Sequence, residues 1–284
     1  MGTRVLSIAA GTLRGTEPGE MVASAKSAGF DAVGFGFEHR EMSQKELNEL
    51  SRQLVDAAIS VIDIEVVRIA PGDDNEAAKR LISYGAALGA KHLLVVSNDD
   101  DEDRTADRFA EICEIAASAG LRPVLEFMAF TAVTSLAAAV RIVERSGAPG
   151  GGVLVDSLHL ARCGDHAKDI AQFSPDLFPY AQICDAPARS PLHRELLANE
   201  ARHERLMPGE GDLELEDLLL ALPSAAPLSV EVLSDDLDDL PSMIRASQTM
   251  QVTLELLGSI GEVEALEPVQ DGDGRGRTDK RGSG

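Results

Sequence analysis

The sequence predicts an α/β fold, a single (β/α)8 TIM barrel followed by a disordered C-terminal tail. Apolar, strand-like runs alternate with amphipathic helical segments over residues 4–257. The helical segments end at spaced glycines, and Gly89, Gly120 and Gly147 lie 31 and 27 residues apart. Periods of about 30 residues are what βα repeats produce, because each parallel crossover needs its helix. A doubly wound open sheet is the alternative arrangement of the same elements.

Each expected strand is an apolar run rich in β-branched residues, as buried parallel strands are. The strands are expected at residues 4–9, 30–37, 60–67, 92–97, 122–128, 152–156, 177–184 and 228–233. Amphipathic periodicity predicts the helices between them. They are expected at residues 20–28, 44–58, 75–88, 103–119, 135–145, 166–173, 215–221 and 240–257. A long polar connection, residues 185–211, follows the seventh strand.

The domain division follows from composition. A chain of 284 residues fits one barrel of this kind. From Gly261 onward the chain is dominated by Gly, Asp, Glu, Arg and Lys, with little apolar surface to bury. We therefore assign residues 1–258 to the barrel and residues 259–284 to a disordered tail.

Charge and hydropathy exclude several classes of protein. The net charge of −22 argues against a nucleic-acid partner, because phosphate contacts need clustered Lys and Arg. No apolar run reaches the ~18 residues of a membrane helix, and no signal-like segment opens the chain. We therefore expect a cytoplasmic protein without a membrane partner. Three cysteines without a CxxC pair are expected as reduced thiols, and the oligomeric state stays open, a homo-oligomer included.

Four consecutive strand ends carry oxygen-bearing side chains. Glu126, Asp156, Gln182 and Glu231 lie at the ends of expected strands five to eight, or just inside them. Those ends converge on one side of the barrel mouth, where barrels keep their chemistry. A lone strand-end acid is more often a helix cap or a loop residue. Several buried carboxylates without a cation would be costly, however, so the set predicts a divalent ion held by hard donors, Mn²⁺ or Mg²⁺.

Further polar residues are candidates for substrate binding. His159 follows Asp156 by three positions and is expected to contact substrate, although a histidine satisfied by a loop carbonyl is the alternative. Arg189, in a Pro-bracketed loop, has a guanidinium suited to a hydroxyl, carbonyl or carboxylate. Arg202 and Arg205 cluster in the connection after strand seven and are expected to close over substrate. For acids such as Glu65, near the end of strand three, solvation or capping is the simpler interpretation.

Several motifs resemble those of the xylose isomerase-like TIM-barrel superfamily, the sugar phosphate isomerase/epimerase group. The resemblance covers approximately residues 4–257 and is nearest to the hydroxypyruvate isomerase-like branch, which has glutamine where many epimerases have histidine. The motifs are Leu125-Glu126, Asp156-Ser157-Leu158-His159, Gln182-Ile183-Cys184-Asp185-Ala186-Pro187, residues 200–211 with Pro208-Gly209-Glu210-Gly211, and Val230-Glu231-Val232. The resemblance implies one divalent ion held by Glu126, Asp156, Gln182 and Glu231.

The resemblance also implies a reaction. Glu126 and Glu231 would act as the acid/base pair, and His159 would contact substrate. A divalent ion chelated by adjacent hydroxyl and carbonyl oxygens acidifies the α C–H bond and stabilises an enediolate. Return of the proton to the neighbouring carbon or to the opposite face gives isomerisation or epimerisation. We therefore expect a metal-dependent isomerase or epimerase of a small sugar or hydroxy-keto acid.

Other functions remain open at this point. A dehydratase or C–C/C–O lyase of the same superfamily would use the same site. An apurinic-site endonuclease shares the fold, but six histidines and the strong negative charge disfavour its zinc-rich, DNA-binding chemistry. A non-catalytic barrel is disfavoured by the presence of all four ligand positions.

Overall fold

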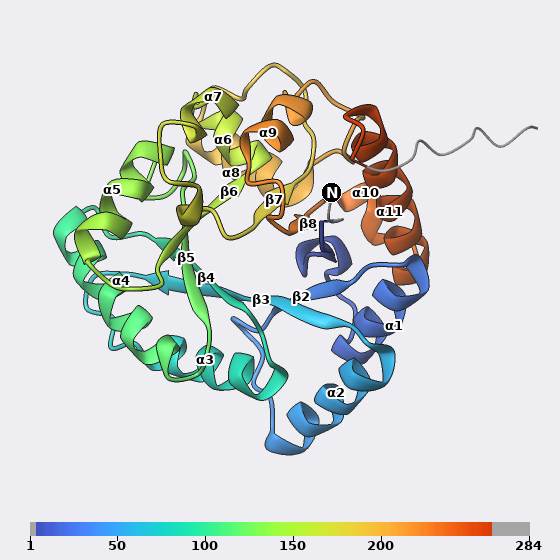
Figure 1. The fold of residues 1–284 in the computed structure, drawn as a ribbon, viewed down its shortest axis with the longest axis horizontal. Coiled ribbons are helices and arrows are strands. Elements are labelled where there is room, and N and C mark those ends of the chain that lie inside the picture. Colours follow the sequence, from blue (N-terminus) through green and yellow to red (C-terminus); the bar gives the residue numbers. More distant parts are fainter. Residues whose placement is uncertain (1–3, 263–284) are drawn as a thin grey trace, which may run out of the picture.

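A closed barrel of eight parallel strands forms the centre of the molecule (Figure 1). The computed structural model describes residues 4–262 of the 284-residue chain. The strands are β1 Leu6–Ile8, β2 Ala32–Gly36, β3 Ser60–Ile69, β4 His92–Ser97, β5 Arg122–Glu126, β6 Gly152–Asp156, β7 Ala181–Ile183 and β8 Leu228–Val230. Each strand pairs with the next, and β8 closes onto β1. The predicted TIM barrel is confirmed, and the open sheet is excluded.

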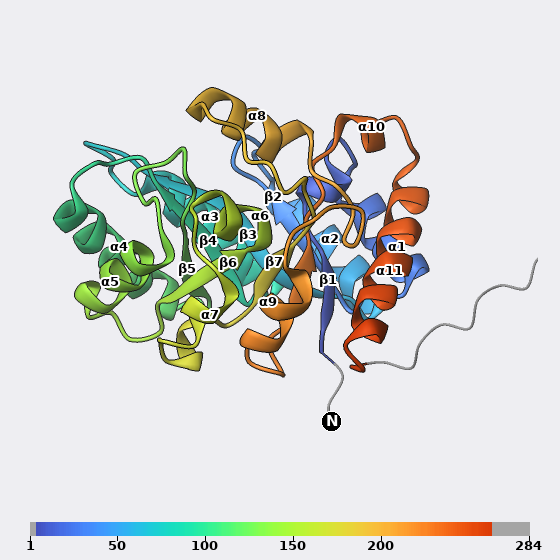
Figure 2. The same cartoon turned by 90° about the horizontal axis from the view of Figure 1, so that it is seen from above.

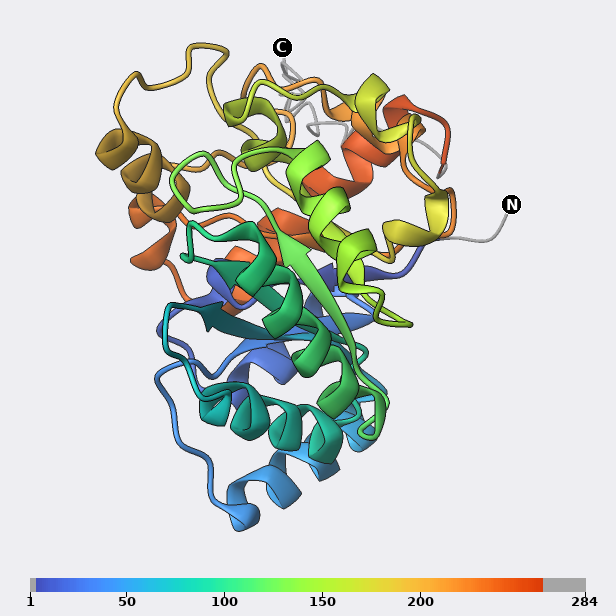
Figure 3. The ribbon, with the colours of Figure 1, turned by 90° about the vertical axis from the view of Figure 1, so that its left-hand side faces the viewer.

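Helices surround the strands. They are α1 Pro18–Ala28, α2 Gln44–Ala57, α3 Glu76–Leu88, α4 Glu102–Ala117, α5 Leu136–Ser146, α6 Ser157–Arg162, α7 Ala167–Ile170, α8 Arg194–His203, α9 Leu215–Ala221, α10 Asp235–Asp238 and α11 Ser242–Ser259, with 3-10 turns η1 Gly11–Leu13 and η2 Pro175–Leu177. Helices α3, α4 and α5 pack side by side on the outside of the barrel (Figure 3). Among the described helices, none is long and apolar enough to cross a membrane.

Local sequence signals set several helix boundaries. Ser43 and Glu46 form a capping box at the start of α2. Asp101 caps α4 by accepting hydrogen bonds from the backbone of Asp103 and Arg104. Gly89 ends α3 with a φ of 71°, a left-handed conformation that glycine adopts without strain.

Inside the barrel, a layer of apolar side chains lies next to the buried polar side chains near the barrel mouth. Its apolar members are Ala32, Ile62, Leu94, Val96, Val124, Leu154 and Tyr180. The larger core lies between the strands and the helices. Arg4 pairs with Glu262 at 2.7 Å, so an ion pair joins the two ends of the described part of the chain. The rest of the predicted tail, residues 263–284, lies outside the described residues.

The main difference from expectation is in the connection 185–211. It was expected to be a polar connection, but it contains helix α8, which lies away from the helical ring at the end of the barrel opposite the first described residues (Figure 2). Only Glu200 and Ala201 of α8 are buried. The segment is rich in charged residues and has few apolar residues to bury, so its composition indicated a polar connection rather than a helix.

Candidate functional site

Asp156 and Gln182 point into the barrel. Leu154 and Tyr180, two residues earlier on β6 and β7, belong to the interior apolar layer. Because side chains alternate along a strand, Asp156 and Gln182 face the same way. The two residues are register partners, so they lie at the same height. Both are fully buried.

Glu126 and Glu231 complete the same inward face. Glu126 ends β5, two residues after the interior Val124. Glu231 follows β8 and lies two residues beyond Ser229, the register partner of Gln182. Both glutamates are buried. The structure therefore places all four predicted ligands on one side of the mouth, as the alternation of the strands requires.

Glu126, Asp156 and Glu231 form an acidic cluster, and His159 lies next to it. Asp156 is the N-cap of α6, and its Oδ1 accepts the backbone N–H of His159 at 3.0 Å. This cap explains the Asp-x-x-His spacing, since an N-cap side chain bonds the amide three residues on. The His159 Nε2 lies 3.9 Å from Glu126 Oε1. Donor atoms of Glu126, Asp156 and His159 all lie within 4.8 Å of one another, close enough to share an ion.

Arg205 lies inside this cluster. It is 4% exposed, and its Nη1 donates to Asp156 Oδ2 at 2.7 Å and lies 3.2 Å from Glu231 Oε2. Its Nε donates to the carbonyl of Ala201, which fixes the side chain to the end of α8. Arg205 therefore neutralises part of the acidic cluster, which the sequence interpretation of a closing loop did not anticipate.

The pKa values reflect competition between burial and charge. Burial raises the pKa of Glu126 well above its usual value, with further contributions from Asp156 and Glu231. Burial also raises the pKa of Glu231, to about 7, although Arg205 opposes the shift. For Asp156 burial acts upward too, but Arg205 and His159 outweigh it and the pKa is lowered. Burial lowers the pKa of His159 to about 4, so its ring is neutral near pH 7.

The donor set fits a divalent cation. Neither the Oε1 nor the Nε2 of the buried Gln182 has a hydrogen-bond partner among the described residues. An unpaired buried amide is costly, and an ion at the mouth would satisfy its oxygen. Burial, the largest cause of the raised pKa values of Glu126 and Glu231, disfavours their ionised forms, and a bound cation would stabilise those forms. Oxygen donors of this kind suit Mn²⁺ or Mg²⁺, and the nearby imidazole also suits Zn²⁺.

A cavity of about 130 Å³ opens beside the cluster. Its polar lining includes Glu126, His159, Arg205 and Glu231, and its apolar lining comes from Val66, Leu94, Val96, Met128, Phe130 and Leu233. A second cavity of about 550 Å³, towards β1 and β2, shares Glu65, Val66, Glu231 and Leu233 with the first. The two cavities therefore adjoin at the barrel mouth.

The remaining predicted contacts divide into two groups. Arg202 lines the 130 Å³ cavity, with its guanidinium carbon 5.5 Å from the centre of the Phe130 ring. Arg189 is exposed and lines neither mouth cavity, so its role stays a prediction.

Two further residues of the cavity were not expected from the sequence. Arg68 was not singled out, and it lines the 130 Å³ cavity from the end of β3. The sequence favoured a solvated or capping Glu65, but this residue lines both cavities.

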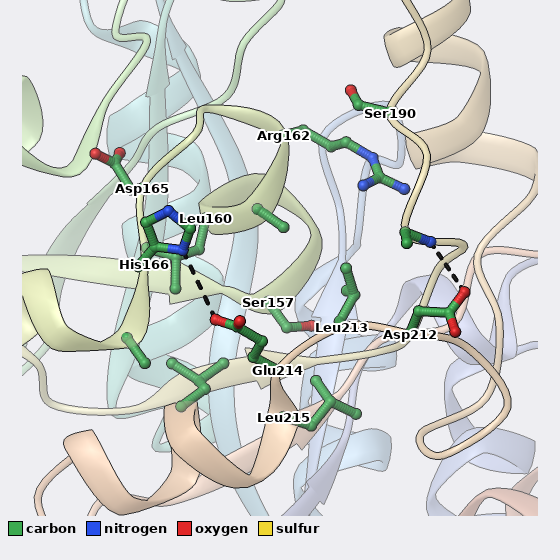
Figure 4. Close-up of a pocket in the computed structure, with 14 residues that line it drawn as sticks. Ser157, Leu160, Arg162, Asp165, His166, Ser190, Asp212, Leu213, Glu214 and Leu215 are labelled. Carbon is green, nitrogen blue, oxygen red and sulfur yellow. Dashed lines mark hydrogen bonds and ion pairs between the residues drawn. The ribbon is translucent and has the colours of Figure 1, made fainter.

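Another cavity, of about 220 Å³, lies outside the mouth between α6, α7 and α9 (Figure 4). There His166 pairs with Glu214 at 3.7 Å, and Asp212 accepts the backbone N–H of Ala188. None of the four predicted ligands lines it. It is therefore separate from the acidic cluster.

The turn Pro208–Gly211 positions Arg205. Asp185 accepts the backbone N–H of Gly209 and of Leu213, both at 3.0 Å. The backbone of Asp185 also bonds that of Leu206 in both directions. This anchor fixes the path of the chain just after Arg205.

Gly211→Ala is expected to destabilise this turn and to lower activity. A Cβ at Gly211 would lie 2.4 Å from Asp185 Oδ1 and 2.5 Å from the Ala186 carbonyl oxygen, so the backbone must move. We expect a loss of about 1–3 kcal/mol in the free energy of unfolding, measured by urea denaturation. Gly19→Ala is the matched control, because its Cβ would meet only the mobile end of Gln53. Equal stability of the two variants would contradict this account.

Comparison with known proteins agrees with the fold. A family model described as xylose isomerase-like TIM barrel matches residues 22–254. A 3-dehydroshikimate dehydratase of Pseudomonas aeruginosa is 28% identical over 275 residues, which cover 88% of this chain and 41% of that protein. The chain thus spans less than half the length of that relative.

Two solved structures are similar in fold. The IOLI protein, determined with a bound zinc atom, has a TM-score of 0.78 at 18% identity, covering 90% of this chain and 98% of that one. An L-ribulose 3-epimerase has a TM-score of 0.71 at 17% identity, covering 92% and 96%. At these identities the likeness concerns the fold alone.

Proposed function

The chain belongs to the xylose isomerase-like TIM barrel family, and from this premise we propose that it is a divalent-metal-dependent enzyme. Its proposed reaction begins with removal of a proton from the carbon beside a carbonyl group of a small hydroxy-ketone. The observation that carries the proposal is the inward-facing set Glu126, Asp156, Gln182 and Glu231, in which the amide of Gln182 is buried without a partner. A divalent ion, when bound, supplies a Lewis acid that lowers the pKa of the adjacent C–H bond.

The protein residues have separable roles in this proposal. Glu126 and Glu231 are buried carboxylates on two strands, and they take and return the proton. His159 has a neutral ring beside Glu126, which suits a hydrogen bond to a substrate hydroxyl. Arg205 holds Asp156 and Glu231 in place. Leu233 and Phe130 contribute apolar lining to the cavity that these groups share.

Two outcomes can follow the same first step. Return of the proton to the neighbouring carbon or the opposite face gives an isomerase or epimerase, and the presence of two carboxylates supports it. Departure of a hydroxyl group from the next carbon gives a dehydratase: the C–H electron pair becomes the C=C bond, and the hydroxyl leaves with a proton as water. The relative that is 28% identical over most of the chain, a dehydratase, supports this second candidate.

Deuterium exchange tests the shared first step. Protein loaded with Mn²⁺ is expected to exchange an α-hydrogen with D₂O in at least one member of a panel of ketoses, hydroxy-keto acids and keto-glycosides, followed by NMR. A chelator is expected to abolish exchange, and Mn²⁺ or Mg²⁺ to restore it. Full exchange in metal-free protein would remove the metal from the proposal. The position of the label, and any loss of water, separates the two outcomes.

A further inference from the structure

Arg202 is a cation at the rim of the mouth cavity without an acidic partner. It lies on α8, it is exposed, and it forms no ion pair within residues 4–262. Its guanidinium sits over the Phe130 ring, and that ring also contacts the ring of His159, at 5.6 Å between centroids. Phe130 therefore links the rim cation to the acidic cluster, and the N–H groups of Arg202 remain available to a ligand.

The other arginines of the cavity are already paired. Arg205 is held by Asp156 and Glu231. Arg68 uses Nε and Nη2 to bind both carboxylate oxygens of Glu38, at 2.7 and 3.2 Å. Its Nη1 forms no hydrogen bond in the described part of the chain, so Arg68 retains one free donor towards the same cavity. Of the arginines that line this cavity, Arg202 is thus the one without an ion-pair partner in the described part of the chain, and Arg68 retains one free donor.

Polar and apolar side chains line different sides of the 130 Å³ cavity. Oxygen donors and His159 occupy the β5–β8 side, whereas Val66, Leu94, Val96, Met128 and Phe130 form an apolar wall in which Glu65 and Arg68 are the polar exceptions. A sugar with a hydroxyl on every carbon would place several hydroxyls against this wall without partners, which is costly. A substrate with adjacent oxygens at one end, an apolar carbon frame and a negatively charged group at the other end would match this separation of polar and apolar side chains.

We infer that Arg202, assisted by Arg68, binds a carboxylate of the substrate, so that the substrate is a small hydroxy-keto acid with an apolar or planar frame rather than a neutral sugar. This inference rests on the proposed function. In this arrangement the substrate oxygens beside the reacting carbon lie at the acidic cluster, and the substrate carboxylate lies at Arg202. The carbon frame of the substrate packs against Phe130. Arg202 is fixed by stacking rather than by an ion pair, which leaves its charge for the ligand.

The test compares two ligands of similar shape, one with a carboxylate and one with a neutral amide in its place. Binding of 3,4-dihydroxybenzoate and of 3,4-dihydroxybenzamide to the Mn²⁺-loaded protein is measured by calorimetry. Wild type is expected to bind the carboxylate about 10- to 100-fold more tightly, because charge-assisted hydrogen bonds carry the difference. Arg202→Met is expected to lose this preference. Arg202→Lys is expected to keep part of it, because lysine retains the positive charge but lacks the planar guanidinium that donates two parallel hydrogen bonds. Arg68→Met is expected to reduce the preference several-fold.

Arg141→Met, which changes an exposed ion pair with Glu102 on the outer helices, is the control and is expected to keep the wild-type preference. A wild type that binds both ligands equally, or an Arg202→Met variant that still prefers the carboxylate, overturns the inference. Deuterium exchange by the same preparations reports on the proposed function separately. Exchange without any carboxylate preference rejects the inference alone, whereas absence of exchange with every substrate rejects the proposed function.

Discussion

Glu231→Gln is expected to lower turnover by about 10²–10⁴-fold, the range for loss of a general acid or base, and to leave the barrel folded. The amide cannot carry the proton, and it is a weaker ligand than the carboxylate. The folded state should tolerate the change. Glu231 is buried, and burial raises its pKa to about 7, so replacing it with a neutral group removes charge that the interior disfavours. Arg205 keeps its 2.7 Å bond to Asp156.

The measurement combines turnover, metal content and thermal unfolding. Glu102→Gln, on the outer face of α4, is the control and is expected to retain wild-type turnover. Wild-type turnover in Glu231→Gln would exclude Glu231 from the mechanism. If the variant binds Mn²⁺ normally but is inactive, its role is in proton transfer. If the metal is lost as well, its role as a ligand accounts for the effect.

The barrel and the inward set of donors could be predicted because both depend on local periodicity. Once β5 to β8 are placed as neighbours, alternation fixes which side Asp156 and Gln182 face. The N-cap geometry likewise fixes His159 relative to Asp156. These relations need no knowledge of the chain path outside a strand and its next turn.

The positions of the arginines could not be predicted in the same way. Arg205 reaches Asp156 because the turn after it is anchored on Asp185, whose carboxylate accepts backbone N–H groups 24 and 28 residues further along the chain. Local periodicity does not reveal partners at such a distance. Arg202 depends on α8, a predominantly polar helix of which only Glu200 and Ala201 are buried. Arg68 enters from β3, on the opposite side of the barrel from β7.

Arg205→Met is expected to give the largest loss of stability in metal-free protein, about 3–5 kcal/mol near neutral pH, because it leaves buried carboxylates without their counter-charge. Arg205, Asp156 and Glu231 are all almost fully buried, so solvent screens their interaction little. Methionine fills a similar volume but cannot donate to Asp156 Oδ2 or interact with Glu231 Oε2.

The effect is expected to depend on pH, and its sign follows from the pKa shifts. Glu231 has a folded pKa raised above its unfolded value, so between pH 4.5 and about 7 the folded state binds more protons and stability falls as pH rises. Arg205 opposes this shift, and it also lowers the pKa of Asp156, whose ionised form stabilises the fold above pH 3.8.

Removing Arg205 raises both carboxyl pKa values, so the loss should be smaller at pH 5 than at pH 8. Urea unfolding of chelator-treated protein at pH 5, 6, 7 and 8 measures it, with Arg141→Met as the exposed-pair control. A loss independent of pH would mean that Arg205 acts by packing rather than by charge. Added Mn²⁺ should recover part of the loss at pH 8, because a divalent ion supplies the counter-charge that the variant lacks.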